Sequence, residues 1–424
     1  MANKSKDNFD LSFCKNISLK IFNEVRELTR DIEGVTRESY GKGENITSNY
    51  LINLAKQNDL FIEIDKASNI YFSLNNNVNE KYILIGSHID SVPMGGNFDG
   101  LAGVVAGLAI LIEIKNKKIL DLPNIKVLAL RGEESAWYGI NYIGSKAIFG
   151  LLNEKNLNLK HREKDLKLFE AMNKCQVDLN IIKSKKTLLD KKEILAFVEV
   201  HIEQGPVLIQ KKWPAAIVTG IRGNFRYRNI ICKGSAGHSG TIPRWLRNDA
   251  VFATSDLIMR MDDHWSSILQ HGGDLVLTCG IFFTDSNHHA MSRIPGELYF
   301  SFESRSQDEE TLLSLDDLLK SECKTIEKER GVYFTFDEMI KSKPAKINNK
   351  ILKKLQYAAQ LNQLKDALIP SGAGHDASVF SNEGIPTGMI FIRNANGSHN
   401  PSETMDINDY LIGITILKDF IFNF

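Results

Sequence analysis

The chain has 424 residues, which is long for one hydrophobic core, so two domains are expected. Hydrophobic residues make up 43% of the chain and charged residues 25%, a composition typical of soluble globular proteins. The 52 Lys and Arg residues equal the 52 Asp and Glu residues, so the net charge gives no support for a nucleic-acid partner or an anionic membrane surface.

Two further features bear on location and metal chemistry. The longest apolar run, 101–112, is too short to span a bilayer, and the first residues lack the apolar segment of a secretory signal. The five cysteines are scattered and never spaced C-x-x-C, which favours reduced thiols over disulfides or a Cys-based zinc site. We therefore expect a cytoplasmic protein in which any metal is held by His and carboxylate side chains.

The first part of the chain alternates buried strands with helices. Short apolar runs at 82–85, 125–130 and 196–200 predict strands, 101–117 predicts a well-buried helix, and the Lys-rich stretch 154–192 predicts surface helices. This alternation predicts an α/β fold with a largely parallel sheet that is covered by helices on both faces. Ligands of such sheets bind beyond the carboxyl ends of the strands.

The middle of the chain shows a different order of elements. The predicted order is a strand at 226–232, a helix at 248–268, strands at 275–283 and 297–303, a helix at 309–330 and a strand at 332–336. This βαββαβ order is the ferredoxin-like pattern. We place this second domain at 214–331, inserted into a discontinuous catalytic domain formed by 1–213 and 332–424.

Polar side chains cluster just after the predicted strands of the first domain. They are His88 with Asp90, Asp99 in a Gly-rich loop, the adjacent pair Glu133 and Glu134, His201 and His399. Asp90 is placed to hold the ring of His88 in one tautomer, and adjacent carboxylates repel one another unless a cation lies beside them. Each residue alone is more often an ordinary surface or core residue. Together, the three His and the three carboxylates Asp99, Glu133 and Glu134 beyond one sheet predict ligands suited to Zn²⁺ or Mn²⁺.

Several longer motifs resemble one known family. They are the block 86–107, Glu133-Glu134, Glu-Val-His201-Ile-Glu-Gln-Gly-Pro, Gly-His238-Ser-Gly-Thr-Ile-Pro, Ser371-Gly-Ala-Gly-His-Asp-Ala and Gly-Ser-His399-Asn-Pro. The motifs resemble the hydantoinase/carbamoylase branch of the M20 metallopeptidase superfamily, which contains N-carbamoyl-L-amino-acid hydrolases, β-ureidopropionases and allantoate amidohydrolases. His201 stands where peptidases of the superfamily tend to carry a carboxylate, which points to this branch.

The resemblance implies two divalent metal ions per subunit. Asp99 would bridge the two ions, His88 and His201 would complete one site, and Glu134 and His399 would complete the other. Ligands of this kind accept Zn²⁺ or Mn²⁺, and also Co²⁺ or Ni²⁺.

The resemblance also implies roles around the substrate. Glu133 would be the general base, and His238 in the second domain would stabilise the oxyanion. Gln204 is similar to a family residue that contacts the carbamoyl group, and Arg305 to an arginine that binds the substrate carboxylate with two hydrogen bonds. Because the family's second domain pairs with its twin and contributes to the partner's active site, a hinged lid and a homodimer are implied.

Three further positions concern the substrate rather than the metal. Ser292 stands where the family often has Asn, and Trp137 stands where it commonly has Arg. By family analogy, His375 lies at the substrate end of the cleft, although His375 and Asp376 could equally cap the N-terminus of a helix.

The predicted reaction is hydrolysis of an N-carbamoyl-L-amino acid to the free amino acid, CO₂ and ammonia. The partner is then a small ureido carboxylate rather than a nucleic acid or a membrane. Allantoate is the near alternative because it carries the same ureido group and a carboxylate, and an M20 aminoacylase or peptidase comes third. From another class, a metal-binding scaffold without catalysis remains an alternative. Glu133 argues against it, because a carboxylate beside Glu134 is costly to keep without a function.

Overall fold

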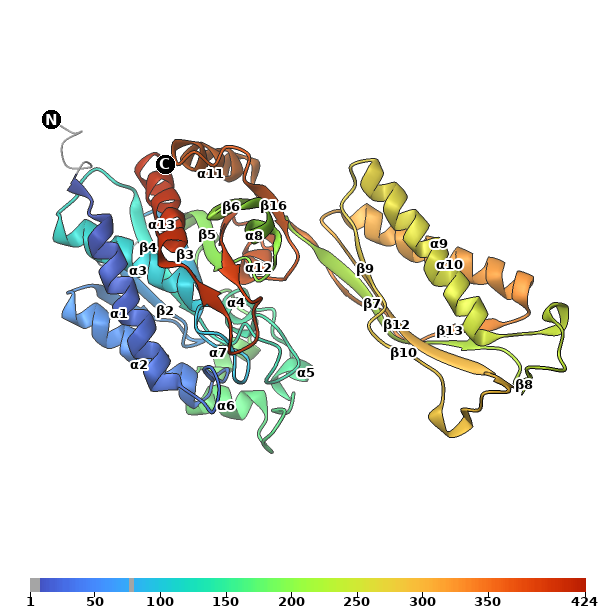
Figure 1. Cartoon of the computed structure of the whole chain (residues 1–424). Helices are drawn as coiled ribbons and strands as arrows, with labels where there is room; N and C mark the ends of the chain where they lie inside the picture. The colour runs from blue at the N-terminus through green and yellow to red at the C-terminus, as the bar shows by residue number, and fades with distance from the viewer. Residues whose placement is uncertain (1–7, 76–79) are drawn as a thin grey trace. The chain divides into compact units, whose positions relative to one another are not determined.

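The computed structural model describes residues 8–75 and 80–424, and the chain divides into two compact units (Figure 1). The larger unit ends at Thr219 and resumes with Lys346–Phe424, whereas the smaller unit is Gly220–Ala345. Both boundaries lie further along the chain than the expected 214–331. The shift at the second boundary has a simple cause: β13 (Tyr333–Phe336) and β14 (Ile340–Ser342) both pair with a strand of the smaller unit, so that unit continues past residue 331.

The larger unit contains most of the helices and a nine-stranded sheet. Its described helices are α1 (Leu11–Thr29), α2 (Lys42–Gln57), α3 (Leu101–Asn116), α4 (Ile143–Ile148), α5 (Glu154–Leu157), α6 (Leu168–Lys174), α7 (Leu179–Lys183), α8 (Val207–Lys211), α11 (Asn349–Leu361), α12 (Asp376–Asn382) and α13 (Ile407–Phe422). Its described strands are β1 (Phe61–Ile64), β2 (Ile70–Ser73), β3 (Tyr82–His88), β4 (Asn124–Leu130), β5 (Ile194–Ile202), β6 (Ala215–Ile221), β15 (Ala345–Lys346), β16 (Leu368–Ser371), β17 (Thr387–Ile392), β18 (Asn394–Ala395) and β19 (Thr404–Met405).

The centre of the large sheet is parallel. The strand order is β1-β2-β4-β3-β5-β17-β6-β15, and β16 pairs with β6. Strands β4, β3, β5 and β17 run parallel to their neighbours within this group, whereas β1, β2 and β6 are paired antiparallel and extend the sheet on either side. The carboxyl ends of four neighbouring strands therefore lie at one edge, where parallel sheets place their ligands.

Helices cover both faces of this sheet. Helices α1, α2, α3, α11 and α13 contribute to one large core with the sheet, and α12 packs against β5 and β17 on the other face, where Phe380 stacks on Phe197. Helix α3 is apolar around its whole circumference, as expected for a helix that is buried on all sides. Its Gly103 allows close approach to the sheet, since a Cβ there would lie 2.0 Å from the backbone oxygen of Val200. This packing fixes the start of α3 beside the carboxyl ends of β3 and β5.

The smaller unit is built on an antiparallel sheet. Its elements are β7 (Gly223–Lys233), β8 (Gly237–His238), α9 (Ala250–Gln270), β9 (Val276–Thr278), β10 (Phe282–Phe283), β11 (Arg293–Ile294), β12 (Glu297–Ser306), α10 (Glu309–Arg330), β13 and β14. The main strand order is β10-β12-β7-β13, and α9 and α10 pack on this sheet around a core of their own. The single strand expected at 275–283 is divided into β9 and β10, because the chain departs from the β12 ladder near Ile281, whose backbone N–H bonds the Ser301 hydroxyl.

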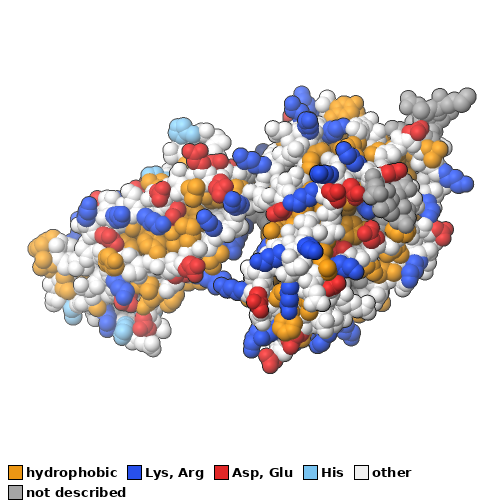
Figure 2. Space-filling model, turned by 180° about the vertical axis from the view of Figure 1, so that it is seen from behind, with side chains coloured by type: hydrophobic (Ala, Val, Ile, Leu, Met, Phe, Trp, Pro, Cys, Tyr) orange, Lys and Arg blue, Asp and Glu red, His pale blue; other side chains and the backbone are white. Residues whose placement is uncertain are grey.

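The surface agrees with the balanced composition. On the face drawn in Figure 2, Lys and Arg side chains are intermixed with Asp and Glu side chains. None of the described helices combines the length and the apolar character needed to cross a bilayer. All five cysteines lie within the described residues, and all are free thiols.

Candidate metal centre

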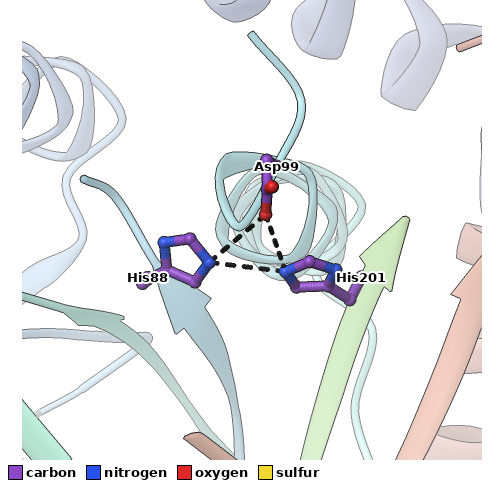
Figure 3. A group of neighbouring side chains, drawn as sticks. All are labelled: His88, Asp99 and His201. Atoms are coloured by element: carbon purple, nitrogen blue, oxygen red, sulfur yellow. Dashed lines mark hydrogen bonds and ion pairs between the residues drawn. The ribbon is translucent and has the colours of Figure 1, made fainter. Parts of the chain in front are cut away.

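Three predicted ligands meet at the edge formed by the parallel strands. His88 is the last residue of β3, His201 lies one residue before the end of β5, and Asp99 lies two residues before α3. Figure 3 shows that the three side chains point toward one another. Asp99 Oδ1 lies 3.5 Å from Nε2 of His88 and 3.1 Å from Nε2 of His201, and the two ring nitrogens are 3.3 Å apart.

The other nitrogens of the two rings show what this group of atoms can bind. Nδ1 of His88 faces the backbone oxygen of Asp90 at 3.1 Å, and Nδ1 of His201 faces that of Ile202 at 2.8 Å. Each Nδ1 therefore carries a proton, and in the neutral rings both Nε2 lone pairs face Asp99 Oδ1, a buried oxygen without a hydrogen-bond partner among the described residues. Three electron-rich atoms cannot bond one another, so a cation fits between them.

Their neighbours shift the pKa values of two of these groups in opposite directions. Burial alone would lower the pKa of His88, but its bonds to Asp90 and Asp99 raise the pKa well above the usual range. Burial alone would raise the pKa of Asp99, but the nearby imidazoles of His201, His399 and His88 hold it well below its usual range.

A second group of donor atoms uses the other oxygen of Asp99. Asp99 Oδ2 lies 3.3 Å from Nε2 of His399, and the same nitrogen lies 3.3 Å from Glu134 Oε1. These bonds, to Asp99 first and then to Glu134, raise the pKa of His399 to about 11. Asp99 thus offers one oxygen to each group, as a bridging ligand does. We refer to the residues of the two groups as the five candidate ligands: His88, Asp99, Glu134, His201 and His399.

Asp90 joins the ligands to the strand end that carries the two glutamates. Its Oδ1 lies 3.3 Å from Nδ1 of His88 and accepts the backbone N–H of Glu133 at 3.0 Å, while its Oδ2 accepts the backbone N–H of Glu134 at 3.1 Å and the hydroxyl of Ser39 at 2.5 Å. Asp90 therefore orients one ligand ring and fixes the position of both glutamates.

Close packing also fixes the loop that carries Asp99. Gly100, at the start of α3, has φ +67°, and a Cβ there would lie 2.4 Å from the ring of His88. Only glycine adopts this conformation without strain and leaves room for the imidazole. A larger residue at this position would push apart the two ligands His88 and Asp99.

The two glutamates differ in their surroundings. Burial raises the pKa of Glu133 well above its usual range, against the opposing charge of His88 and with the support of Glu134. Burial also raises the pKa of Glu134, but the hydrogen bond with His399 opposes the rise. Glu134 is thus engaged with an imidazole, whereas Glu133 keeps the higher proton affinity. That difference suits Glu134 as a ligand and Glu133 as a base.

A buried ion pair supports the turn before the glutamates. Arg131 Nη2 lies 2.6 Å from Glu44 Oε2, and Glu44 Oε1 accepts the backbone N–H of Gly132 at 2.8 Å. Burial raises the pKa of Glu44 to about 7, although the charge of Arg131 opposes this. Removing one member of such a pair costs about 3–5 kcal/mol, so the turn that presents Glu133 is held firmly.

Gln204 and His375 border the centre. Gln204 has a left-handed backbone (φ 63°), and its Nε2 donates to Asp99 Oδ2 at 2.8 Å. His375 stands at the N-cap of α12, but its side chain makes no capping bond. Its ring instead contacts the ring of His201 edge-on, with centroids 4.6 Å apart, and Nε2 faces the hydroxyl of Ser371 at 2.9 Å. His375 therefore occupies the N-cap position predicted by one alternative, while its side chain lies beside His201.

The remaining predicted substrate residues belong to the smaller unit. His238 ends β8, is exposed and pairs with Arg293 of β11, next to Ser292. Arg305 lies near the end of β12, opposite Asn224 at the start of β7. Within this unit His238 and Ser292 are neighbours beside β11, whereas Arg305 lies at the end of β12 that is far from β11.

Trp137 lies in the larger unit, away from bulk solvent. Its side chain is buried, its ring stacks on His161 with centroids 5.4 Å apart, and its Nε1 donates to the backbone oxygen of Ser91 at 2.8 Å. The ring face and the N–H of the indole are thus both used in contacts within the larger unit.

Sequence reasoning missed two residues that contact Asp99 or its loop. Glu403 Oε1 accepts the backbone N–H of Phe98 at 2.8 Å, and the Ser398 hydroxyl lies 2.5 Å from Asp99 Oδ2 and 2.7 Å from Glu403 Oε2. Ser398 was signalled by its position beside His399. Glu403 had no such signal, because its contact with Phe98 joins residues 305 positions apart.

Comparisons with known proteins identify the family of the chain. A family model described as peptidase family M20/M25/M40 matches residues 84–423. The chain is 31% identical over 355 residues to an allantoate amidohydrolase of Escherichia coli (strain K12), covering 83% of this chain and 84% of that relative. It is 30% identical over 404 residues to an N-carbamoyl-L-amino-acid amidohydrolase of Paenarthrobacter aurescens, covering 94% and 96%.

A solved structure shows the same fold. The hydantoinase/carbamoylase family amidase from Burkholderia ambifaria has a TM-score of 0.85 to this chain at 22% identity, covering 99% of this chain and 98% of that one. The family match extends over most of the sequence, and the residues that it spans include all five candidate ligands. The chain is therefore a hydrolase that belongs to peptidase family M20/M25/M40.

Proposed function

We propose that this hydrolase is a metal-dependent amidohydrolase that cleaves the ureido C–N bond of N-carbamoyl-L-amino acids. One water is consumed, and the products are the amino acid, CO₂ and ammonia. The observation that carries the proposal is the meeting of the five candidate ligands around the two oxygens of Asp99, with Glu133 close to His88 and Glu134.

The donor set suits two divalent cations, Zn²⁺ or Mn²⁺, with Co²⁺ and Ni²⁺ also compatible. Such cations would supply Lewis-acid chemistry, because they polarise a carbonyl and make water more acidic. Glu133 would take the proton of the attacking water and deliver it to the leaving nitrogen. Its buried position and raised pKa fit a group that must hold a proton between these two steps.

Recognition of the ureido group would involve the larger unit. Gln204 and His375 border the ligands, and the amide oxygen of Gln204 is buried without a hydrogen-bond partner among the described residues. An amide in this position would contact the carbamoyl group of the substrate. His375, whose pKa is lowered well below its usual range by burial, would present a neutral ring beside it.

The smaller unit would act as a lid and dimerisation domain. Arg305 lies eight positions after Glu297 in β12, a distance of roughly 26 Å at the rise of a strand. His238 pairs with Arg293, which precedes Glu297 in the chain. One smaller unit therefore cannot bring both Arg305 and His238 to the same small substrate. We infer a homodimer, in which Arg305 binds the substrate carboxylate in its own subunit and His238 stabilises the oxyanion in the partner's site.

The names of the relatives support two substrates. The N-carbamoyl-L-amino-acid amidohydrolase from Paenarthrobacter aurescens matches over the larger share of both chains, and the allantoate amidohydrolase is equally similar in identity. Allantoate therefore stays a second candidate, and dipeptides or N-acyl amino acids a third. The proposed location is the cytoplasm, where thiols such as the five free cysteines stay reduced.

One substrate panel separates these candidates. The purified protein, loaded with Mn²⁺ or with Zn²⁺, is incubated with N-carbamoyl-L-amino acids, their D enantiomers, allantoate, N-acetyl amino acids and dipeptides. Ammonia and free amino acid are then measured separately. We expect equal amounts of both from the N-carbamoyl-L-amino acids. Ammonia from allantoate alone would select the second candidate, and free amino acid without ammonia would indicate an aminoacylase or peptidase.

The same panel addresses a scaffold without catalysis. Such a protein would bind metal and leave every compound intact. The active-site Glu133→Gln variant provides the matched blank, because any turnover that persists in it comes from a contaminating enzyme or from another base.

A further inference from the structure

A fully buried arginine contacts the segment that carries three of the site residues. Arg37 is 0% exposed and heads the described buried side chains in size. Its guanidinium donates to one amide oxygen and two backbone oxygens rather than to a carboxylate. A buried charge with neutral partners is expensive, so its presence calls for an explanation.

Arg37 binds the segment 88–99 at three places. Its Nε donates to the backbone oxygen of Ile89 at 2.9 Å, and its two terminal nitrogens donate to Asn97, to Oδ1 at 3.2 Å and to the backbone oxygen at 3.3 Å. Its backbone N–H donates to the Ser91 hydroxyl at 3.0 Å, and its backbone oxygen accepts the N–H of Ser91 at 2.9 Å. Asn97 is anchored in turn, because its Nδ2 donates to the backbone oxygen of Phe22 in α1 at 2.9 Å.

These contacts join the two ends of the segment. His88 lies next to Ile89, and Asp99 lies two residues after Asn97. A planar guanidinium that bonds both neighbours therefore limits how far the two ligands can separate. The carboxylates whose charges act most strongly on Arg37 are Glu403, Asp99, Asp90 and Glu134. Arg37 thus also places a permanent positive charge beside the acidic residues of the centre.

We propose that Arg37 is a positioning residue that holds His88 and Asp99 at the spacing required for cation binding, by clamping Ile89 to Asn97. The proposal rests on the metal centre of the proposed function, and it assigns to Arg37 no contact with substrate. The clamp requires the fork of the guanidinium, because a single ammonium group cannot reach the three acceptors with the same geometry. The charge alone would be retained by lysine.

The decisive experiment compares Arg37→Lys with Arg37→Met in metal-free protein. Zn²⁺ and Mn²⁺ affinity is measured by competition with a chromophoric chelator, and the visible spectrum of the Co²⁺-loaded protein reports ligand geometry. We expect both variants to lose roughly 10–100-fold in metal affinity, the effect typical of residues that orient ligands, and the Co²⁺ spectrum to change. Arg37→Lys with wild-type affinity and spectrum would overturn the clamp.

Two further variants distinguish loss of the clamp from a general loss of folding. Arg393→Lys is the matched control, because that arginine also lies in the larger unit and donates to both oxygens of Asp409; we expect its metal affinity to be unchanged. Asn97→Ala removes one acceptor of the clamp and keeps Arg37. It should weaken affinity in the same direction, and adding it to Arg37→Lys should cause little further loss. Fully additive losses would show that the two residues do not act together.

Circular dichroism of each metal-free variant shows whether it is folded. If Arg37→Lys is unfolded without metal, Asn97→Ala alone decides the proposal through its metal affinity. If the wild-type protein binds neither Zn²⁺ nor Mn²⁺, the proposed function fails first. If the wild type binds metal and both Arg37→Lys and Asn97→Ala bind it equally well, only the proposed role of Arg37 fails.

Discussion

The two units differ in how many contacts hold their candidate functional side chains in place. In the larger unit, His88, Asp99 and His201 are buried, and each contacts neighbours that set its orientation. In the smaller unit, His238 is exposed on a two-residue strand, and Arg305 lies near the end of β12 beside Glu303. A buried and well-bonded site supports chemistry that needs fixed geometry. His238 and Arg305, which lie on a separate unit, suit substrate recognition, which the proposed lid would complete on closure.

Removing metal should have the largest effect and should act only through the larger unit. Dialysis against a chelator is expected to abolish turnover and to lower the midpoint of thermal unfolding, because the five candidate ligands would lose their cations. Addition of Mn²⁺ or Zn²⁺ should restore both quantities. Full activity in chelated protein, checked by elemental analysis, would show that these residues serve another purpose.

Glu133→Gln should separate catalysis from metal binding. We expect kcat to fall by roughly 10²–10⁴-fold, because a positioned base contributes about this much, while metal content stays unchanged. Glu134→Gln is the paired control, since it should lose metal as well as rate. Equal metal loss in both variants would contradict the division of roles within the pair.

Arg305→Lys tests recognition by the smaller unit. Lysine keeps the charge but loses the two parallel hydrogen bonds to a carboxylate, so KM should rise by roughly 10–100-fold with a smaller change in kcat. Metal affinity should not change. An N-carbamoyl amine without a carboxylate should be a poor substrate for the wild type and should not distinguish it from the variant.

Mixing two inactive variants tests whether His238 acts on the partner's site. Glu133→Gln and His238→Ala subunits, unfolded and refolded together, should recover about a quarter of the wild-type activity, since half of the dimers are mixed and each has one intact site. Each variant refolded alone is the control. If His238 served its own subunit, neither site of a mixed dimer would contain both Glu133 and His238, and no activity would return.

The metal-free centre should make stability depend on pH. Hydrogen bonds with Asp99 and Glu134 raise the pKa of His399 from its ordinary value to about 11. A raised pKa stabilises the folded state below the ordinary value near 6.5, and this stabilisation is lost as the pH rises through the folded value. The unfolding midpoint of chelated protein should therefore be lower at pH 9 than at pH 6. His399→Asn should flatten this dependence.

Part of this organisation was readable from the sequence for a physical reason. Buried parallel strands are continuous apolar runs, and residues just past them meet at one edge of the sheet. His88 and His201 were found in this way, and the helix 309–330 was placed to the residue because its caps and its apolar spacing agree. The antiparallel edge strands β1, β2 and β6 were not predicted, because the first two are short and the third lies beside the domain boundary.

Other features depend on contacts that no local pattern contains. The smaller unit continues to Ala345 because β13 and β14 return to pair with β7. Arg37 reaches the centre from a segment without a predicted ligand, and Glu403 follows His399 by four residues but contacts a loop residue 305 positions earlier in the chain. The orientation of His375 likewise depends on its contact with the ring of His201, which lies 174 positions earlier in the chain.

The way in which Asp90 uses its carboxylate has a consequence for how such an enzyme can change. One side chain contacts the ring of His88 and the backbone of Glu133, so it links a candidate ligand to the proposed base. With the proposed lid, substitutions in the smaller unit would change substrate recognition without altering these contacts of Asp90. Substrate specificity would then be able to change during evolution while the chemistry of C–N bond cleavage stays the same.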